Sequence, residues 1–323
     1  MSHTPSHTLS RAVDTVLDRS VVLGYSTIGL GVRRHLASWP RDPAPGALTG
    51  RQVLVTGASS GLGTATAEGL ARLGADVHLV VRDLDKGARV EGELREAVPG
   101  ASFRLWRCDV GDLDDVRRFA GEAAASGLTF AGIVHNAGVM PPERTESPQG
   151  HEQTMAVHVL GPVLMTDLLL PHLEPDARVV LVTSGGMYTS RLPVRDPEYT
   201  RGEYKPPTAY ARSKRVQVSL LPVLAERWKG VAVHAMHPGW ADTPGVVDSL
   251  PGFHKVTGPI LRDAAQGADT SVWLVAAEPA PEGGLLWHDR RPRPEHLTRR
   301  TRESEADRQA MWEWVREAAG LQD

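Results

Sequence analysis

The stretch TGASSGLG, residues 56–63, decides the fold that the sequence predicts. The apolar run RQVLVT (51–56) precedes it, and LGTATAEGLARLG (62–74), with helical spacing and a glycine suited to a C-cap, follows it. A chain that leaves a strand here must turn sharply, present backbone amides to a phosphate and pack a helix close to the sheet. Glycines remove the side chains that would obstruct each step. The strand before and the helix after therefore indicate a phosphate-binding turn and not an ordinary glycine-rich loop.

Strands and helices continue to alternate downstream of this turn. Predicted strands cover 76–81, 102–110, 131–138, 177–184, 231–239 and 283–289. Predicted helices cover 84–98, 150–172, 208–228 and 264–277, with Pro162 and Pro222 inside two of them. This spacing is typical of a parallel sheet covered by helices on both faces. We therefore expect an α/β fold, a Rossmann-type doubly wound parallel sheet of about seven strands in a single domain.

The two ends of the chain lie outside this alternation. We expect residues 1–48 to form an N-terminal arm and linker, residues 49–290 the dinucleotide-binding domain, and residues 291–323 a C-terminal tail with a helix. The arm segment SVVLGYSTIGLGVRRHLASW (20–39) fits either an interfacial helix at a membrane or an arm packed on its own domain or on a partner subunit. Its glycines weaken a free-standing helix, so we favour the packed arm.

Composition excludes several classes of function. The chain has 323 residues, 41% of them hydrophobic, and a net charge of −3 from 36 Lys and Arg against 39 Asp and Glu. Nucleic-acid partners usually require a basic excess, so we expect none. The single Cys108 excludes an internal disulfide and a cysteine metal cluster, and the histidines lack an acidic third ligand, so we expect no metal site. The first residues lack the order of a secretory signal, and we expect a cytoplasmic protein.

Six short motifs follow one another along the chain. They are TGASSGLG (56–63), CDV (108–110), HNAG (135–138), TS (183–184), YARSK (210–214) and HPGWADT (237–243). In this order they resemble the motif series of the short-chain dehydrogenase/reductase superfamily, from about residue 50 to 290. A narrower resemblance within it is carried by TSGGMY, MHPGWADTPGV and GADTSVWLVA followed by DRRPRPEHL. The resemblance implies a nicotinamide-dependent oxidoreductase acting on a carbonyl or alcohol, with residues 49–290 as an NADP-binding domain that includes its own substrate loops.

The residues after the second predicted strand favour NADP(H) over NAD(H). Folds that bind NAD usually have a carboxylate at the end of this strand, where this chain has Val81 followed by Arg82. A guanidinium there pairs with a 2′-phosphate, which a carboxylate would repel. Asp83 leaves two alternatives open, because it either caps the next helix or reaches the ribose and restores some NAD binding.

The resemblance also implies the other cofactor contacts. Asp109 is expected to contact the adenine and Thr243 the nicotinamide carboxamide. The full implied set is Thr56, Gly57, Ser59, Ser60, Gly61, Leu62, Gly63, Arg82, Asp109, Val110, Asn136, Ala137, Gly138, Tyr210, Lys214, Pro238, Gly239 and Thr243.

Three residues are the candidates for catalysis. Ser184 ends a predicted strand, while Tyr210 and Lys214 are four apart on one helix and so lie on the same face, one turn apart. A nearby ammonium and a cationic nicotinamide ring would lower the pKa of the phenol from about 10. Only five of the 36 basic residues are Lys, so a Lys here indicates a need for a compact donor that can also release a proton, which Arg cannot. Ser184 would hold the substrate oxygen while Tyr210 gives or takes its proton.

The region between Ser184 and Tyr210 holds three further tyrosines, Tyr188, Tyr199 and Tyr204. We expect this insert to form a wall of the substrate cleft, with a solvated loop as the alternative for the latter two. We take Tyr188 and Trp240 as substrate contacts. By resemblance, 243–261 is the substrate loop, and its apolar composition favours a lipophilic carbonyl or alcohol.

One position departs from the superfamily pattern, which usually has Asn where His158 stands. That Asn helps to hold a water in the proton relay from the lysine. The imidazole either replaces the amide in the relay, which makes His158 a fourth catalytic candidate, or displaces the water. The second alternative gives a rival function, a non-catalytic NADP-binding sensor or scaffold. A membrane-surface protein docked through the arm and a homo-oligomer stay open as well.

Overall fold

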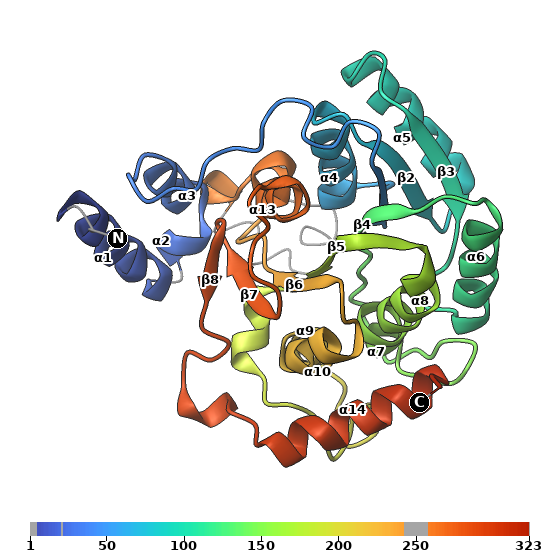
Figure 1. Cartoon of the computed structure of the whole chain (residues 1–323). Helices are drawn as coiled ribbons and strands as arrows, with labels where there is room; N and C mark the ends of the chain where they lie inside the picture. Colours follow the sequence, from blue (N-terminus) through green and yellow to red (C-terminus); the bar gives the residue numbers. More distant parts are fainter. Residues whose placement is uncertain (1–4, 21, 242–257, 323) are drawn as a thin grey trace.

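The computed structural model describes residues 5–20, 22–241 and 258–322. Its centre is an eight-stranded sheet with the order β3-β2-β1-β4-β5-β6-β7-β8 (Figure 1). The strands are β1 Gln52–Thr56, β2 Asp76–Val81, β3 Phe103–Arg107, β4 Phe130–His135, β5 Leu173–Val182, β6 Ala232–Met236, β7 Leu285–His288 and β8 Arg291–Arg293. The first seven strands are parallel, which confirms the predicted doubly wound α/β fold.

The sheet extends beyond the seven predicted strands because the chain turns back after β7. Asp289 and Arg290 adopt left-handed φ angles of 50° and 56°, and β8 then pairs antiparallel with β7. The sequence of β8, Arg-Pro-Arg, has no apolar alternation that would predict a strand. The expected boundary at residue 290 thus falls inside this hairpin, and part of the predicted tail belongs to the sheet.

Helices cover both faces of the sheet (Figure 1). One face carries α4 (Gly61–Arg72), α5 (Leu84–Ala97) and α13 (Ala264–Ala276); the other carries α6 (Leu113–Ala125), α8 (Gly161–Leu169), α9 (Pro206–Ser219), α10 (Leu221–Arg227) and α14 (Glu305–Ala319). Strand side chains alternate between the two cores: Val53 and Val55 of β1 join the first, and Leu54 joins the second.

The helix predicted at 150–172 is one continuous helical run with an irregular middle. It consists of α7 (Gln153–Met155), the π-helical turn η1 (Ala156–Leu160), α8 and the short 3-10 turn η2 (Leu170–His172). Gln153–His172 is long and apolar enough to cross a membrane, but 78% of its apolar window is buried inside the protein, as expected for a core helix. His158, the residue that departs from the superfamily pattern, lies in this π-helical turn. Such turns are frequent at functional sites.

The helix predicted at 208–228 is divided in two. α9 ends at Ser219 and α10 begins at Leu221, with Pro222 in the first turn of α10. A proline inside a helix removes a hydrogen bond and clashes with the preceding turn, and the first turn is where it is tolerated. The catalytic candidates Tyr210 and Lys214 both lie on α9, upstream of the break.

The N-terminal arm forms three helices, α1 (Pro5–Arg19), α2 (Val22–Tyr25) and α3 (Thr27–Arg34). They lie beside β8 at the edge of the sheet (Figure 1). Arg33 of α3 connects them to the sheet, because its guanidinium contacts Asp14 of α1 at 2.7 Å and Asp289 of the β7–β8 turn at 2.6 Å. Of the two structures expected for the arm, this is the one packed on its own domain.

Candidate active site

The glycine turn joins β1 to α4 and packs tightly against the end of β4. Gly57 has a φ of +64°, and a Cβ on it would lie 2.8 Å from the Cα of Ala137. A Cβ on Gly63 would lie 2.2 Å from the carbonyl oxygen of Gly57 and 2.6 Å from Nδ2 of Asn136. Side chains are therefore excluded at both positions for the reason that the sequence predicted. The turn lies between β1 and β4, the point where the strand order reverses and where ligands bind in such sheets.

Thr56 and the start of α4 complete the turn. The Thr56 hydroxyl accepts hydrogen bonds of 3.1 Å from the backbone N–H of Asn136 and of Ala137, which ties β1 to the segment after β4. Ser60 stands at the N-cap of α4, and its side chain makes no capping hydrogen bond. The first N–H groups of this 12-residue helix thus face the glycine turn without a side-chain cap, as a bound phosphate requires. Ser59, Gly61 and Leu62 complete the half-buried turn.

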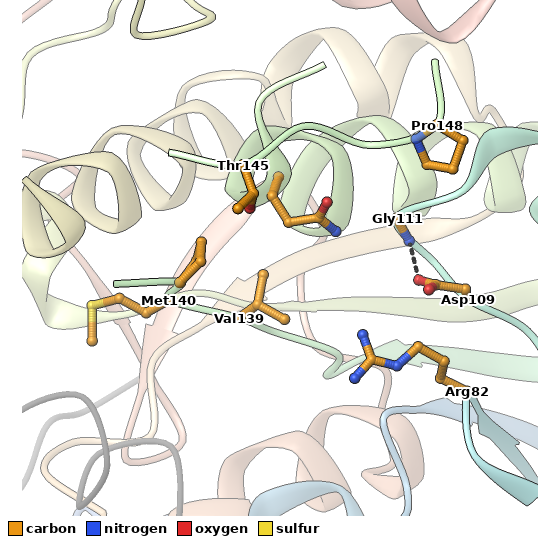
Figure 2. A pocket seen from close by; sticks show the side chains of 9 residues that line it. Arg82, Asp109, Gly111, Val139, Met140, Thr145 and Pro148 are labelled. Atoms are coloured by element: carbon orange, nitrogen blue, oxygen red, sulfur yellow. Dashed lines mark hydrogen bonds between the residues drawn. The ribbon is translucent and has the colours of Figure 1, made fainter. Parts of the chain in front are cut away.

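A pocket of about 490 Å³ opens at the ends of β2 and β3 (Figure 2). Its lining residues are Arg82, Asp109, Gly111, Val139, Met140, Pro141, Thr145, Pro148 and Gln153. The guanidinium of Arg82 points into the pocket, and Asp109 accepts a 3.0 Å hydrogen bond from the backbone N–H of Gly111 (Figure 2). Two residues predicted from distant motifs for the adenosine end of a cofactor therefore share one pocket, beside the buried Val110.

Asp83 is the N-cap of α5. Its carboxylate accepts a 2.9 Å hydrogen bond from the backbone N–H of Lys86, and this bond holds its pKa below the usual value. Of the two roles left open by the sequence, the structure shows the helix cap. Arg82 forms no ion pair within the described part of the chain, which leaves its charge available to an anionic ligand.

Ser184 and Tyr210 come together from β5 and α9. Ser184 directly follows Thr183 at the end of β5, and its Oγ accepts a 3.2 Å hydrogen bond from the backbone N–H of Gly186 in η3 (Gly185–Thr189). The hydroxyl of Ser184 lies close enough to that of Tyr210 to act on its pKa, and both residues are half-buried. Burial raises the pKa of Tyr210 to about 12, against the effect of that hydroxyl. The protein groups alone therefore raise this pKa, and the lowering expected from the sequence includes the cationic nicotinamide ring.

Lys214 lies one turn further along α9 and is buried. Its Nζ donates a 2.7 Å hydrogen bond to the carbonyl oxygen of Val182 and lies 5.5 Å from the centroid of the Tyr210 ring. Burial lowers the pKa of Lys214 from 10.5 to about 7. The hydroxyl of Thr183 donates to the backbone carbonyl of Lys214. Two hydrogen bonds, one from the side chain and one to the backbone of Lys214, therefore join α9 to the end of β5. A lysine in this position can hold or release a proton close to neutral pH.

His158 is fully buried beside these residues, and both of its ring nitrogens are engaged. The backbone N–H of Val139 donates to Nε2 at 2.9 Å, so Nε2 is an acceptor. Nδ1 lies 2.8 Å from the hydroxyl of Ser213, and this hydroxyl donates its own proton to the carbonyl of Tyr210 at 2.9 Å. Nδ1 must therefore be the donor, which assigns the proton to Nδ1.

The surroundings of His158 also keep the ring neutral. Burial first, and the charge of Lys214 second, lower its pKa well below the usual value. Its backbone carbonyl accepts a 2.7 Å hydrogen bond from Nε2 of Gln217. The imidazole thus connects the loop after β4 to the backbone of Tyr210, and neither nitrogen is free for a water relay. A Cβ on the neighbouring Gly138 would lie 3.3 Å from Nε2.

The residues predicted for the substrate are not all in the cleft. Tyr188 is buried, and its hydroxyl donates a 2.8 Å hydrogen bond to the carbonyl of Pro294, so the structure does not place it as a substrate contact. The sequence could not distinguish this role, because Pro294 is 106 residues away. Trp240 is half-buried next to Pro238 and Gly239. Thr243 and most of 243–261 lie outside the described residues.

The insert between the two catalytic candidates is a packed loop. The hydroxyl of Tyr204 donates a 3.0 Å hydrogen bond to the buried carboxylate of Glu152, which caps α7. The guanidinium of Arg212 lies over the ring of Tyr199, 4.3 Å from the ring centroid. Tyr199 and Tyr204 therefore hold the loop against the domain and are not the solvated residues of the alternative expectation.

The arm contributes a residue that the motifs did not predict. Tyr25 is buried, and its carbonyl accepts a 2.8 Å hydrogen bond from the backbone N–H of Trp240. A Cβ on Gly185 would lie 2.8 Å from Cε2 of the Tyr25 ring, and the ring packs edge-on against His237 at 4.6 Å between centroids. Tyr25 thus lies directly behind the segments that present Ser184 and Gly239. The glycine beside Ser184 was the one available signal of this close approach.

A group of possible metal ligands lies far from these residues in the sequence. One ligand atom each of Glu295, His296 and Glu303 lies within 4.8 Å of the others. The guanidinium of Arg215 is already 3.4 Å from Glu303 and 3.3 Å from Nε2 of His296. The cationic partners of this group within the described chain are therefore arginines, Arg215 and Arg308, and both would repel a metal ion.

Comparison with known proteins agrees with this geometry. A family model described as short chain dehydrogenase matches residues 51–251. Bovine dehydrogenase/reductase SDR family member 12 is 39% identical over 279 residues, which cover 84% of this chain and 86% of that protein. Human retinol dehydrogenase 12 is 33% identical over 241 residues, which cover 72% of this chain and 75% of that protein. Both the resemblance seen in the motifs and the narrower one, to family member 12, are confirmed.

Among solved structures, one described as an NAD(P)-dependent gluconate 5-dehydrogenase from Beutenbergia cavernae, with bound NADP, superimposes with a TM-score of 0.61. It is 25% identical and covers 75% of this chain and 96% of its own. The parallel sheet and its flanking helices are thus common to both proteins.

Proposed function

The chain belongs to the short chain dehydrogenase family and is an oxidoreductase of that type; from this premise we propose that it uses NADP(H) and a Ser184–Tyr210–Lys214 set to interconvert a lipophilic carbonyl and its alcohol. The observation that carries the proposal is that Ser184 and Tyr210, both half-buried, lie next to each other one helical turn from the buried Lys214. The same end of the sheet holds the glycine turn.

The turn and the pocket fit a dinucleotide. The cradle that a Cβ would fill at Gly57 and Gly63, with the uncapped start of α4, suits a pyrophosphate, and the 490 Å³ pocket suits an adenosine. Arg82 would pair with a 2′-phosphate, and the carboxylate of Asp83 is engaged in its helix cap. The bound NADP of the gluconate 5-dehydrogenase structure supports the same choice. A bound nicotinamide supplies or accepts the hydride, and proton movement is the task of the chain's own residues.

Tyr210 acts as the acid and the base at the substrate oxygen. In reduction its phenol gives its proton to the carbonyl oxygen, which becomes the hydroxyl of the alcohol, and the phenolate remains; oxidation reverses the transfer. Ser184 donates a hydrogen bond to the same oxygen and orients it. Because protein groups raise the pKa of Tyr210, the phenol holds its proton at neutral pH and is ready for reduction. The cationic ring of an oxidised nicotinamide would favour the phenolate for oxidation.

Lys214 provides the charge next to the phenolate. Its pKa of about 7 lets it release a proton toward Tyr210 and regain one near neutral pH. An arginine would not release its proton, and its planar group would not fit beside the carbonyl of Val182. His158 has no free ring nitrogen and acts by holding the backbone of Tyr210.

The substrate is proposed to be lipophilic. Two observations support this class: the apolar composition of residues 243–261 and the 33% identity to a protein named retinol dehydrogenase 12. Trp240 is proposed as a further substrate contact, since its half-buried ring would offer an aromatic face.

The second candidate function is a non-catalytic NADP-binding sensor or scaffold. It is favoured by His158, because the ring and the carbonyl of this residue are both occupied where the family usually holds a relay water. Cofactor binding does not separate the two functions, and turnover does.

The test uses the purified full-length protein with NADPH and a panel of aliphatic, polyene and polar aldehydes and ketones, read by NADPH absorbance. Tyr210→Phe should bind NADPH as the wild type does and lose turnover on the order of a hundredfold or more. Tyr199→Phe is the matched control, because that phenol only donates to the carbonyl of Glu203, and it should be silent. A wild type that binds NADPH without turning over any member of the panel would favour the sensor.

A further inference from the structure

The middle of the N-terminal arm lies behind two segments of the candidate active site. Tyr25 ends α2 and Ser26 caps α3, and they are only 3% and 0% exposed. One of the two segments, residues 238–240, follows β6 and contains predicted cofactor and substrate contacts. The other consists of Ser184 and Gly185, which follow β5. Because β5 and β6 are parallel neighbours, both segments leave the sheet at the same end, where one side chain can contact both.

Residues 238–240 are bonded to the arm through the backbone. The carbonyl of Tyr25 accepts a 2.8 Å hydrogen bond from the backbone N–H of Trp240. Gly239 has a φ of +77°, and a Cβ on it would lie 2.7 Å from the same carbonyl oxygen. The segment therefore lies directly on the arm, at a distance that leaves no room for a side chain between them.

Arg262 strengthens this attachment from a third part of the chain. Its guanidinium, which is 1% exposed, donates a 3.1 Å hydrogen bond to the carbonyl of Pro238. It also donates to two carbonyls of the arm, that of Gly24 at 3.1 Å and that of Ser26 at 3.3 Å. Its backbone N–H donates to the carbonyl of Trp240 at 2.8 Å. One buried residue therefore binds the arm and the segment after β6 to each other.

The ring of Tyr25 faces the second segment. A Cβ on Gly185 would have three atoms of this ring as its nearest neighbours, Cε2 at 2.8 Å, Cδ2 at 3.4 Å and Cζ at 3.6 Å. The ring therefore limits where the backbone next to Ser184 can lie. The same ring packs edge-on against His237 and Trp240, at 4.6 and 6.3 Å between centroids. Tyr25 thus packs against the segments that follow β5 and β6 at once.

We propose that Tyr25 is a positioning residue of the reaction, which fixes Ser184 relative to residues 238–240 and so holds the substrate oxygen at the nicotinamide. This role rests on the proposed function, which assigns both segments to substrate and cofactor. A misplacement of about 1 Å can lower a rate about a hundredfold. The proposed adenosine site lies at the ends of β2 and β3, whereas the arm lies beside β8 at the opposite edge of the sheet (Figure 1). Tyr25 should therefore affect turnover and not the affinity for NADPH.

The first measurement compares kcat for carbonyl reduction with the Kd of NADPH in the full-length protein. Tyr25→Leu should lower kcat on the order of tenfold and leave the Kd unchanged, whereas Tyr25→Phe keeps the ring and should match the wild type in both. The matched control is Phe103→Leu, which shortens an aromatic side chain of similar burial, 5% exposed, on β3 at the opposite edge of the sheet, and should leave kcat unchanged. An equal loss of kcat in the control, or a parallel loss of NADPH affinity in Tyr25→Leu, would overturn the proposal.

A second substitution tests the contact between Tyr25 and the Ser184 segment. Gly185→Ala should lower kcat on the order of tenfold, because its methyl group would meet the ring of Tyr25. In the Tyr25→Leu protein the same substitution should cost less than about twofold, because leucine lacks the Cε2 and Cζ atoms that the methyl group would meet. If the two losses multiply instead, the ring of Tyr25 does not position Ser184.

Hydrogen exchange followed by mass spectrometry tests the role of Tyr25 without any turnover. Backbone N–H groups of residues 184–187 and 238–241 should exchange faster in Tyr25→Leu than in the wild type, whereas those of residues 56–63 should exchange alike. A wild type that reduces no carbonyl would contradict the proposed function, and the exchange rates would then still decide whether Tyr25 holds the two segments. Unchanged exchange in Tyr25→Leu would overturn the positioning role whatever the activity.

Discussion

Two groups of buried cations in this protein respond to burial in opposite ways. In the candidate active site, Lys214 is 2% exposed, its Nζ donates to a backbone carbonyl, and no carboxylate of the described residues forms an ion pair with it. Under the arm, Arg33 is 1% exposed and contacts the carboxylates of Asp14 and Asp289. Arg262 contacts Asp289 as well, at 2.6 Å.

The pKa values follow this difference. Burial without a carboxylate lowers the pKa of Lys214 to about 7, so its charge can change near neutral pH. Burial acts to raise the pKa of Asp289, but the charges of His288 and Arg262 outweigh it and hold this pKa well below the usual range. A buried charge with its counter-charges is permanent and structural, whereas one without them can titrate. The comparison predicts which buried groups serve stability and which serve chemistry.

The largest effect is expected at Asp289. Asp289→Asn removes the carboxylate that Arg33 and Arg262 share and leaves two buried guanidinium groups without it. Loss of one partner in a buried ion pair costs about 3–5 kcal/mol of unfolding free energy. Urea denaturation measures this loss. Glu226→Gln, which affects the exposed pair with Lys229, should change stability by no more than about 0.5 kcal/mol. If Asp289→Asn and Glu226→Gln lower the unfolding free energy by equally small amounts, the buried ion pairs do not hold the arm on the sheet.

The opposite sign is expected at Lys214. Lys214→Met should abolish turnover while leaving the folded state as stable as the wild type or more stable, because it removes a buried cation that has no counter-charge among the described residues. Arg33→Met should instead lower the unfolding free energy by about 3 kcal/mol, since it leaves Asp14 and Asp289 with fewer partners. Denaturation of both variants at pH 6 checks the contrast, and two losses of similar size would contradict it.

The pH dependence of Lys214 sharpens the same point. The folded protein binds this proton with a pKa of about 7 and the unfolded chain with about 10.5. Between these values the unfolded state holds more protons, so the wild type should gain stability over Lys214→Met as pH rises from 7 to 10. One pKa unit is worth about 1.4 kcal/mol, so the gain amounts to a few kcal/mol. Parallel stability curves for the two proteins would show that Lys214 is charged and compensated in the fold.

A smaller effect is expected at Arg82, a cation of the pocket without an ion pair in the described chain. We expect NADPH to bind at least about tenfold more tightly than NADH, or about 1.4 kcal/mol. Arg82→Ala should remove most of this gap, because the carboxylate of Asp83 stays in its helix cap. Titration of both cofactors by fluorescence measures it. Equal affinities in the wild type would contradict the choice of NADP(H).

The smallest effect is expected at His158, which lies beside the catalytic candidates but is held like a structural group. Its two engaged nitrogens and its lowered pKa predict no ionisation of this residue between pH 5 and 8 in the rate profile. His158→Asn should shift the turnover rate without changing the shape of that profile. A wild-type inflection in this pH range that His158→Asn removes would restore the relay role expected from the sequence.

The sequence by itself determined the features that depend on local spacing. Gly57 and Gly63 are required by a turn of eight residues, and four residues between Tyr210 and Lys214 are enough to bring both to one side of a helix. The order of strands and helices likewise determined the parallel sheet, because each unit of strand, helix and strand packs in one way. These features could be read without knowledge of any distant contact.

Tertiary structure alone decided the hydrogen-bond and ion-pair partners of these side chains and how deeply each is buried. Asp289 meets an arginine 256 residues away, Tyr188 turns its hydroxyl to Pro294, and His158 is held by Ser213 and Val139. The direction of the Tyr210 pKa also depends on how deeply α9 packs, since desolvation by neighbours from several segments outweighs the nearby hydroxyl of Ser184. Spacing along the chain limits which residues share a helix face, but hydrogen bonding and burial are properties of the packed whole, where segments remote in sequence displace water together.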